Sequence, residues 1–333
     1  MEKRPLRPDD LSKLLLSKLS VSLIPRPLTP TGRVAVAAPA SAAIDAADAH
    51  AGIAAMRARG LTVEPGRAFV QPDGFLSGPD DERADELNAL LARTDLDAVV
   101  CLRGGYGVLR ILDLIDYDAA RAVRPLVVGY SDITALHLAL YTQSGLTGLS
   151  GPMVAPDWPT LDAETEAHFW RLASGEANVD IAGPGSERPF GLASGDAEGV
   201  LLGGNLSMVA ALIGTPYFPD MAGAILVVED VGEAPYRIDG LLARLRLAGV
   251  LEKLGGLVFG LFTDAEPPEG RPSATVDEVL DHYAQFVDGP VAAGLTYGHV
   301  RRRVTLPIGV RARLTVDGPA ARLVALTPVT QEV

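Results

Sequence analysis

The sequence predicts an α/β protein whose N-terminal domain contains a parallel sheet and whose C-terminal domain is a second α/β unit. The chain of 333 residues is long enough for two ordinary domains. Apolar residues make up 48% of it and charged residues 21%, a balance typical of a globular protein. Short apolar runs alternate with helical patterns along the chain, and this alternation predicts parallel strands with helices on both faces of the sheet.

The first domain is predicted over residues 31–172. Apolar runs predict strands at residues 33–39, 61–63, 97–102 and 126–128. Helical patterns lie between and after them, at 41–59, 80–93, 109–115 and from Ile133 onward. We expect the loops at the carboxyl ends of these strands to line a ligand crevice, as in other open α/β sheets.

Residues 173–194, within a stretch rich in Gly, Pro and Ser, are predicted to be a linker to a C-terminal domain at 195–333. Strands are expected there at 200–202, 224–228, 257–261, 290–293, 303–306 and 323–326, and helices at 205–213, 237–248 and 276–286.

Residues 1–30 form an N-terminal extension. Its apolar stretch at 11–24 is interrupted by Lys13 and Lys18, which argues against both a secretion signal and a membrane span and predicts a short amphipathic helix. We therefore expect a cytoplasmic protein without a membrane partner.

Charge and cysteine content exclude several classes of function. A formal net charge of −13 makes nucleic acid a poor partner, because phosphate binding needs clustered Lys and Arg. The only basic cluster, Arg301 to Arg303, is interpreted as a solvated turn. Cys101 is the single cysteine, so neither an intrachain disulfide nor a Cys-based zinc site can form; its apolar neighbours predict a core position.

Ser131 lies at a bend between a predicted strand and a predicted helix, in the run Val-Val-Gly-Tyr-Ser-Asp-Ile-Thr at 127–134. A serine there can present its hydroxyl beside backbone amides that stabilise developing negative charge. The alternative is a helix cap, a role that serine often plays. The local sequence leaves both interpretations open.

The turn Arg-Gly-Gly-Tyr-Gly at 103–107 also joins a predicted strand to a helix. It lacks the third glycine of a dinucleotide fingerprint and the lysine of a phosphate-binding loop, so an amide donor for an oxyanion fits better than a phosphate site.

A serine nucleophile needs a base and a group that orients the base. His299 follows Tyr297-Gly298 in a predicted turn, where it could face a cleft or simply be exposed. Glu229 and Asp230 end an apolar strand, and either could orient an imidazole, cap a helix or pair with a surface arginine. His137 is expected to be structural, His50 and His168 are expected at the surface, and His282 lies within a predicted helix.

The order Ser131, Glu229, His299 is the nucleophile–acid–base order of α/β hydrolases, although the Gly-x-Ser-x-Gly elbow is absent. A set of short segments lies along the chain, over about residues 31–327: 103–107 with Arg110, 129–137, 203–206, 214–217, 226–230, 298–299 and 305–309. In these segments, and in their order, the chain resembles the LD-carboxypeptidase family of serine peptidases.

The resemblance implies a parallel-sheet nucleophile domain followed by a domain with a partly barrel-like sheet. It implies a triad of Ser131, Glu229 and His299, with the amides of Asp132 and Gly105 as the oxyanion hole. Gly104, Tyr106 and Asn205 are expected to contact the substrate. It further implies a homodimer without metal or cofactor that removes D-alanine from a muropeptide during cytoplasmic peptidoglycan recycling.

Two alternatives stay open. Microcin C immunity peptidases share the triad but cleave a peptidyl-nucleotide. A protein of another class could use the same crevice to bind a small anionic ligand without turnover.

Overall fold

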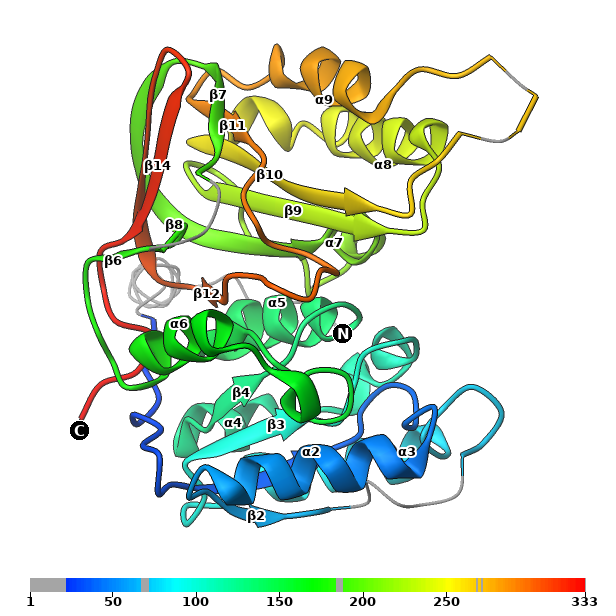
Figure 1. Cartoon of the computed structure of the whole chain (residues 1–333), viewed down its shortest axis with the longest axis vertical. Helices are drawn as coiled ribbons and strands as arrows, with labels where there is room; N and C mark the ends of the chain where they lie inside the picture. The colour runs from blue at the N-terminus through cyan, green and yellow to red at the C-terminus, as the bar shows by residue number, and fades with distance from the viewer. Residues whose placement is uncertain (1–21, 67–71, 184–187, 268, 271, 333) are drawn as a thin grey trace, which may run out of the picture.

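The protein consists of two sheets with their flanking helices, one above the other (Figure 1). The computed structural model describes residues 22–66, 72–183, 188–267, 269–270 and 272–332. The predicted helix at 11–24 lies outside the described residues except for 22–24, where Leu23 pairs with Leu146 in an isolated bridge. None of the described helices is long and apolar enough to cross a membrane.

The first sheet has the strand order β12-β5-β4-β3-β1-β2. Its five parallel strands are β1 (Arg33–Ala37), β2 (Thr62–Glu64), β3 (Ala98–Cys101), β4 (Leu126–Val128) and β5 (Gly148–Ser150). β12 (Leu306–Ile308) joins antiparallel to β5 and comes from the C-terminal part of the chain. The central strands β3 and β4 are buried throughout, as expected for a sheet covered by helices on both faces. Cys101 is fully buried in β3, which confirms its predicted core position.

The helices of this half are α2 (Ala46–Ala58), α3 (Asp80–Leu91), α4 (Tyr117–Val123), α5 (Ile133–Ser144) and α6 (Ala163–Ala173). Ten of the twelve residues of α5 are buried, because α5 lies between the first sheet and the second (Figure 1). The helix that carries the Ser131 turn is therefore held by both halves of the molecule.

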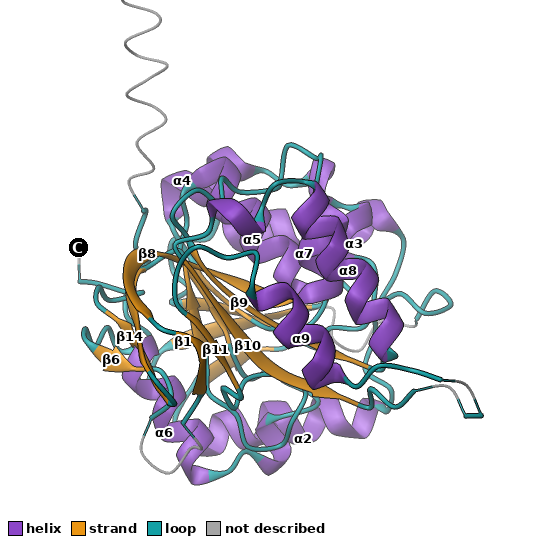
Figure 2. Ribbon diagram, turned by 90° about the horizontal axis from the view of Figure 1, so that it is seen from above, coloured by secondary structure: helices purple, strands orange, loops and turns teal. Residues whose placement is uncertain are grey.

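The second sheet is a mixed barrel of seven strands. It runs β13-β8-β9-β10-β11-β7-β14, and the pairing of β14 with β13 closes it, while β6 (Val179–Asp180) adds to β14 outside the ring. Its strands are β7 (Phe190–Ala193), β8 (Gly195–Asn205), β9 (Ile225–Val231), β10 (Gly256–Thr263), β11 (Val291–Ala293), β13 (Arg311–Asp317) and β14 (Ala320–Ala325). The helices α7 (Leu206–Leu212), α8 (Pro235–Leu247) and α9 (Val276–Ala284) pack on its outer side (Figure 2). The predicted α/β architecture with a barrel-like second sheet is thus confirmed.

Three segments differ from expectation. Two strands of the second sheet, β6 and β7, lie within the predicted linker: β6 pairs with β14, and β7 pairs with β11 and β14. The predicted helix at 109–115 is instead two short 3₁₀ turns, Val108–Arg110 and Leu112–Leu114, in which the amides of Arg110, Ile111 and Leu114 donate to carbonyls three residues earlier. The strand expected at 303–306 begins at Leu306 and pairs in the first sheet, since hydrophobicity marks a buried strand but not the sheet that receives it.

His168 was expected at the surface, and this is wrong: it is 6% exposed, and its Nδ1 accepts a hydrogen bond from the Thr305 amide at 3.1 Å. His137 is also buried, and its Nε2 lies 2.8 Å from the carbonyl of Gly129. Burial lowers the pKa of each of these two imidazoles to about 4. Both are therefore neutral in the folded protein at pH 7.

Acid should consequently destabilise the protein. In the unfolded chain these histidines have a pKa of about 6.5 and bind protons below that pH, whereas in the folded chain they stay neutral until the pH approaches 4. Their contribution to the free energy of unfolding is therefore fully present above pH 6.5 and is lost as the pH falls toward 4. We expect a loss of about 2 kcal/mol per histidine at pH 5, measured as a lower urea midpoint than at pH 7.5. His168→Gln should remove its share of this slope and exposed His282→Gln should not; equal slopes in the two variants would contradict the assignment.

Candidate active site

Ser131 occupies a strained turn between β4 and α5. Its backbone φ is +63°, a left-handed value that non-glycine residues adopt rarely and often at functional sites. The alternative that Ser131 caps the helix is wrong: the N-cap is Asp132, and no side chain forms a cap hydrogen bond there. The Ser131 hydroxyl has no hydrogen-bond partner among the described residues, so it is available to a bound molecule.

The surrounding structure holds this turn in place. His137 is neutral, and its Nε2–H donates to the carbonyl of Gly129. The Ser131 carbonyl accepts from the amide of Thr134 at 2.9 Å, and the Asp132 carboxylate accepts from Val108. Burial raises the pKa of Asp132 to about 6, against the opposing effects of the Val108 amide and Arg83. These contacts fix the serine on both sides, so His137 acts structurally, as predicted.

The glycine turn at 103–107 lies directly against Ser131. A Cβ on Gly104 would stand 2.8 Å from the Ser131 Cβ and 3.0 Å from its Oγ, so only glycine fits at this position. The Gly104 carbonyl accepts from the Ser41 amide at 3.3 Å. Because carbonyl and N–H point in opposite directions across a trans peptide, the Gly105 N–H points away from Ser41. Neither this amide nor that of Asp132 has an acceptor within the described ranges.

Glu229 and His299 form a hydrogen-bonded pair. Glu229, a residue of β9 that is 1% exposed, accepts a hydrogen bond from His299 Nδ1 at 2.8 Å. This bond leaves the imidazole Nε2 free to exchange a proton. Gly298 has a φ of +141°, and a Cβ there would lie 3.0 Å from the Glu229 Oε2, so a glycine is what allows the imidazole to reach the carboxylate.

Asp230, the other candidate acid, is engaged elsewhere. Its carboxylate accepts from Asn205 Nδ2 at 2.8 Å, from the Ser207 amide and hydroxyl at 2.9 and 2.8 Å, and from its own neighbour Val231 at 2.9 Å. These bonds tie β9 to the start of α7, which gives Asp230 a structural role and leaves Glu229 as the partner of His299.

Tertiary contacts bring the two halves of the site together. The Asn205 amide, at the end of β8, donates to the Thr134 hydroxyl in the first turn of α5 at 2.9 Å. Beside it, a Cβ on Gly204 would lie 2.3 Å from that same hydroxyl oxygen. The chain that follows His299 then enters the first sheet as β12, and the His299 ring meets the ring of Tyr130 edge-on at 5.2 Å. Tyr130 directly precedes Ser131.

Arg303 is a residue that the sequence interpretation placed wrongly on a solvated turn. It is 7% exposed and pairs with buried Asp157 at 2.5 Å. Its guanidinium stacks over the Tyr130 ring at 4.1 Å, and its Nη1 donates to the Val300 carbonyl at 2.9 Å. Arg303 therefore braces the loop of His299 against the residue before Ser131. No local signal distinguished it from its two arginine neighbours.

The residues expected to contact substrate lie in different settings. Gly104 packs against Ser131, as described above. Tyr106 is 48% exposed, with its ring edge-on to Phe75 at 5.3 Å. The Asn205 side chain is occupied within the protein, since its Oδ1 also accepts from the Met208 amide at 3.2 Å to cap α7. Contact with substrate stays a prediction for all three residues.

Comparisons with known proteins identify the family. Residues 34–151 match the model of the LD-carboxypeptidase N-terminal domain, and residues 198–314 match that of the LD-carboxypeptidase C-terminal domain. The chain belongs to the LD-carboxypeptidase family. Among the described residues, no cluster of three His, Cys, Asp or Glu side chains could hold a metal ion.

Several LD-carboxypeptidase relatives cover most of the chain. The murein tetrapeptide carboxypeptidase of Pseudomonas aeruginosa is 34% identical over 85% of this chain and 93% of its own length. The crystal structure of the muramoyltetrapeptide carboxypeptidase of Oxalobacter formigenes matches with a TM-score of 0.78 and 32% identity over 89% of this chain and 99% of that one. The microcin C7 self-immunity protein of Escherichia coli is 29% identical over 80% and 85%.

Proposed function

We propose that this protein is a serine LD-carboxypeptidase that removes the terminal D-alanine from a muropeptide tetrapeptide, at a diaminopimelate–D-Ala or Lys–D-Ala bond, in peptidoglycan recycling. The observation that carries the proposal is the hydrogen bond of 2.8 Å between the buried Glu229 carboxylate and His299 Nδ1. The His299 ring packs edge-on against Tyr130, the residue before Ser131. Acyl transfer to serine requires an acid, a base and a nucleophile, and we assign these roles to Glu229, His299 and Ser131.

The reaction follows from the proposed roles. His299 Nε2 takes the proton of the Ser131 hydroxyl as its oxygen attacks the scissile carbonyl, and the amides of Asp132 and Gly105 stabilise the oxyanion. Glu229 orients the imidazole and stabilises its cation. The carbon–nitrogen bond then breaks, and His299 gives its proton to the leaving amine of D-alanine. Water, deprotonated by the same imidazole, hydrolyses the acyl-enzyme and restores Ser131.

The proposal includes a cytoplasmic homodimer that needs no metal or cofactor. It rests on the family resemblance for these points. Sedimentation of the purified protein tests the assembly, and an assay of D-alanine release with and without a chelator tests whether the activity depends on a metal.

The decisive assay is incubation with L-Ala-γ-D-Glu-meso-diaminopimelate-D-Ala and with its lysine counterpart. We expect mass spectrometry to show the loss of one D-alanine residue from at least one of these peptides. If both stay intact with folded enzyme, while a peptidyl-nucleotide is cleaved, the protein is a microcin-type peptidase instead. If none is cleaved and a fluorophosphonate probe leaves Ser131 unlabelled, the catalytic proposal fails in favour of binding alone.

A further inference from the structure

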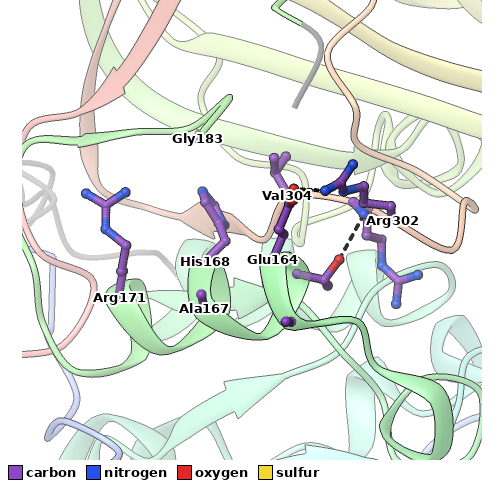
Figure 3. Close-up of a pocket in the computed structure, with 10 residues that line it drawn as sticks. Glu164, Ala167, His168, Arg171, Gly183, Arg302 and Val304 are labelled. Atoms are coloured by element: carbon purple, nitrogen blue, oxygen red, sulfur yellow. Dashed lines mark hydrogen bonds and ion pairs between the residues drawn. The ribbon is translucent and has the colours of Figure 1, made fainter. Parts of the chain in front are cut away.

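The three consecutive arginines after His299 have three different environments. Arg303 is buried and neutralised by Asp157. Arg302 is exposed and forms an ion pair with Glu164 in the first turn of α6. Figure 3 shows this ion pair at the wall of another, smaller cavity. Arg301 is exposed and forms no ion pair with any residue in the described part of the chain.

Arg301 lines a cavity of about 320 Å³ that also contains His299 and Tyr130. The rest of its wall comes from the 299–303 loop and from residues 156–161, including the hydroxyl-bearing Thr160. His299, the proposed base, is therefore part of the wall of this cavity.

The charges around the cavity leave Arg301 as its one uncompensated cation among the described residues. Asp157 is paired with Arg303, and His299 is paired with Glu229. The cavity thus carries a local positive charge in a protein whose formal net charge is −13. An arginine in such a place suits a carboxylate, which can accept two parallel N–H bonds from the guanidinium.

We propose that the cavity beside His299 is a carboxylate subsite, in which Arg301 binds one of the carboxylates of the substrate and so selects acidic peptides. This inference rests on the proposed function. A tetrapeptide with diaminopimelate offers three carboxylates: that of the leaving D-alanine, that of the diaminopimelate side chain and the α-carboxylate of D-glutamate. The chemistry is the same for all three, and the experiment separates them.

The test compares Arg301→Gln with Arg302→Gln, a matched control that removes the same charge one residue away and outside the cavity. Steady-state kinetics are measured on the parent tetrapeptide. Arg301→Gln should raise KM roughly 10- to 100-fold with kcat nearly unchanged, because a hydrogen bond to a charged group contributes about 1.5–3 kcal/mol. Arg302→Gln should change KM less than about twofold, as an exposed ion pair contributes little. Equal effects of the two variants would overturn the subsite.

Three analogues identify the carboxylate: the C-terminal D-alaninamide, the D-glutamate α-amide, and the lysine tetrapeptide, which lacks the side-chain carboxylate. One of them should raise the KM of the unmodified enzyme as much as Arg301→Gln does, and Arg301→Gln should add nothing further with that analogue. Full additivity with all three analogues would contradict carboxylate binding at Arg301.

Calorimetric titration of Ser131→Ala and of Ser131→Ala/Arg301→Gln with the tetrapeptide separates the two proposals. Turnover by the unmodified enzyme together with binding that does not depend on Arg301 would overturn the subsite alone. Arg301-dependent binding without turnover by the unmodified enzyme would overturn the proposed reaction and leave the subsite standing.

Discussion

Ser131→Ala should lower the kcat of D-alanine release by about 10⁵- to 10⁶-fold, the scale of loss seen when a serine peptidase loses its nucleophile. Ser131 supplies the only proposed nucleophile, and its hydroxyl makes no hydrogen bond that alanine would remove from the described structure. The backbone strain at φ +63° is similar for alanine, so the free energy of unfolding should change by less than about 1 kcal/mol. Single-turnover kinetics and a urea titration measure the two effects separately.

The control for this variant is Ser174→Ala, which removes an exposed hydroxyl at the end of α6 and should keep full activity. A fluorophosphonate should label the unmodified protein and the control but not Ser131→Ala. Residual activity within tenfold of the unmodified enzyme would show that Ser131 is not the nucleophile.

Glu229→Gln should lower kcat by about 10⁴-fold with little change in KM. The glutamine side chain is almost the same size, but its amide can donate to His299 Nδ1, which the carboxylate cannot do. The imidazole would then carry its proton on Nε2 and could no longer accept the proton of Ser131. The carboxylate that stabilises the imidazolium would be lost at the same time.

Asp230→Asn is the matched control, because it changes the neighbouring carboxylate in the same way. Asp230 accepts bonds from Asn205, Ser207 and Val231, so the variant should lose about 1–3 kcal/mol of stability. Its kcat, corrected for the folded fraction, should stay close to that of the unmodified protein. The interpretation of Glu229 would be wrong if the two variants lost activity equally.

Much of the fold could be predicted from local patterns. β3, residues 34–37 of β1 and residues 225–228 of β9 are apolar runs, and helices such as α2 and α8 follow helical spacing between such runs. The short strands β5, β6 and β12, of two or three residues each, carry too little pattern for assignment to a sheet. Closure of the barrel depends on the pairing of β13 with β14 and of β14 with β7, which no single segment encodes alone.

The features of the candidate site likewise fall into those that consecutive residues predict and those that depend on tertiary contacts. The sequence by itself determined that a serine follows a strand at a bend, that an acid ends a later strand and that a histidine follows a glycine, because these are properties of consecutive residues. It also determined the chain order Ser131, Glu229, His299 and the family resemblance that this order supports.

Local sequence left two adjacent carboxylates open and the family resemblance implied Glu229, but only the tertiary structure shows that Glu229 contacts His299 while Asp230 is bonded elsewhere. Only the tertiary structure shows that the three arginines at 301–303 differ. Asp230 accepts a hydrogen bond from Ser207 at the start of α7, 23 positions away in the chain. Arg303 forms an ion pair with Asp157, 146 positions away. Such pairings depend on how β12 returns to the first sheet and how α5 packs against β8, which are long-range consequences of burial. Local sequence reports how a segment is built, whereas the partner of a charged side chain is set by what the whole fold places beside it.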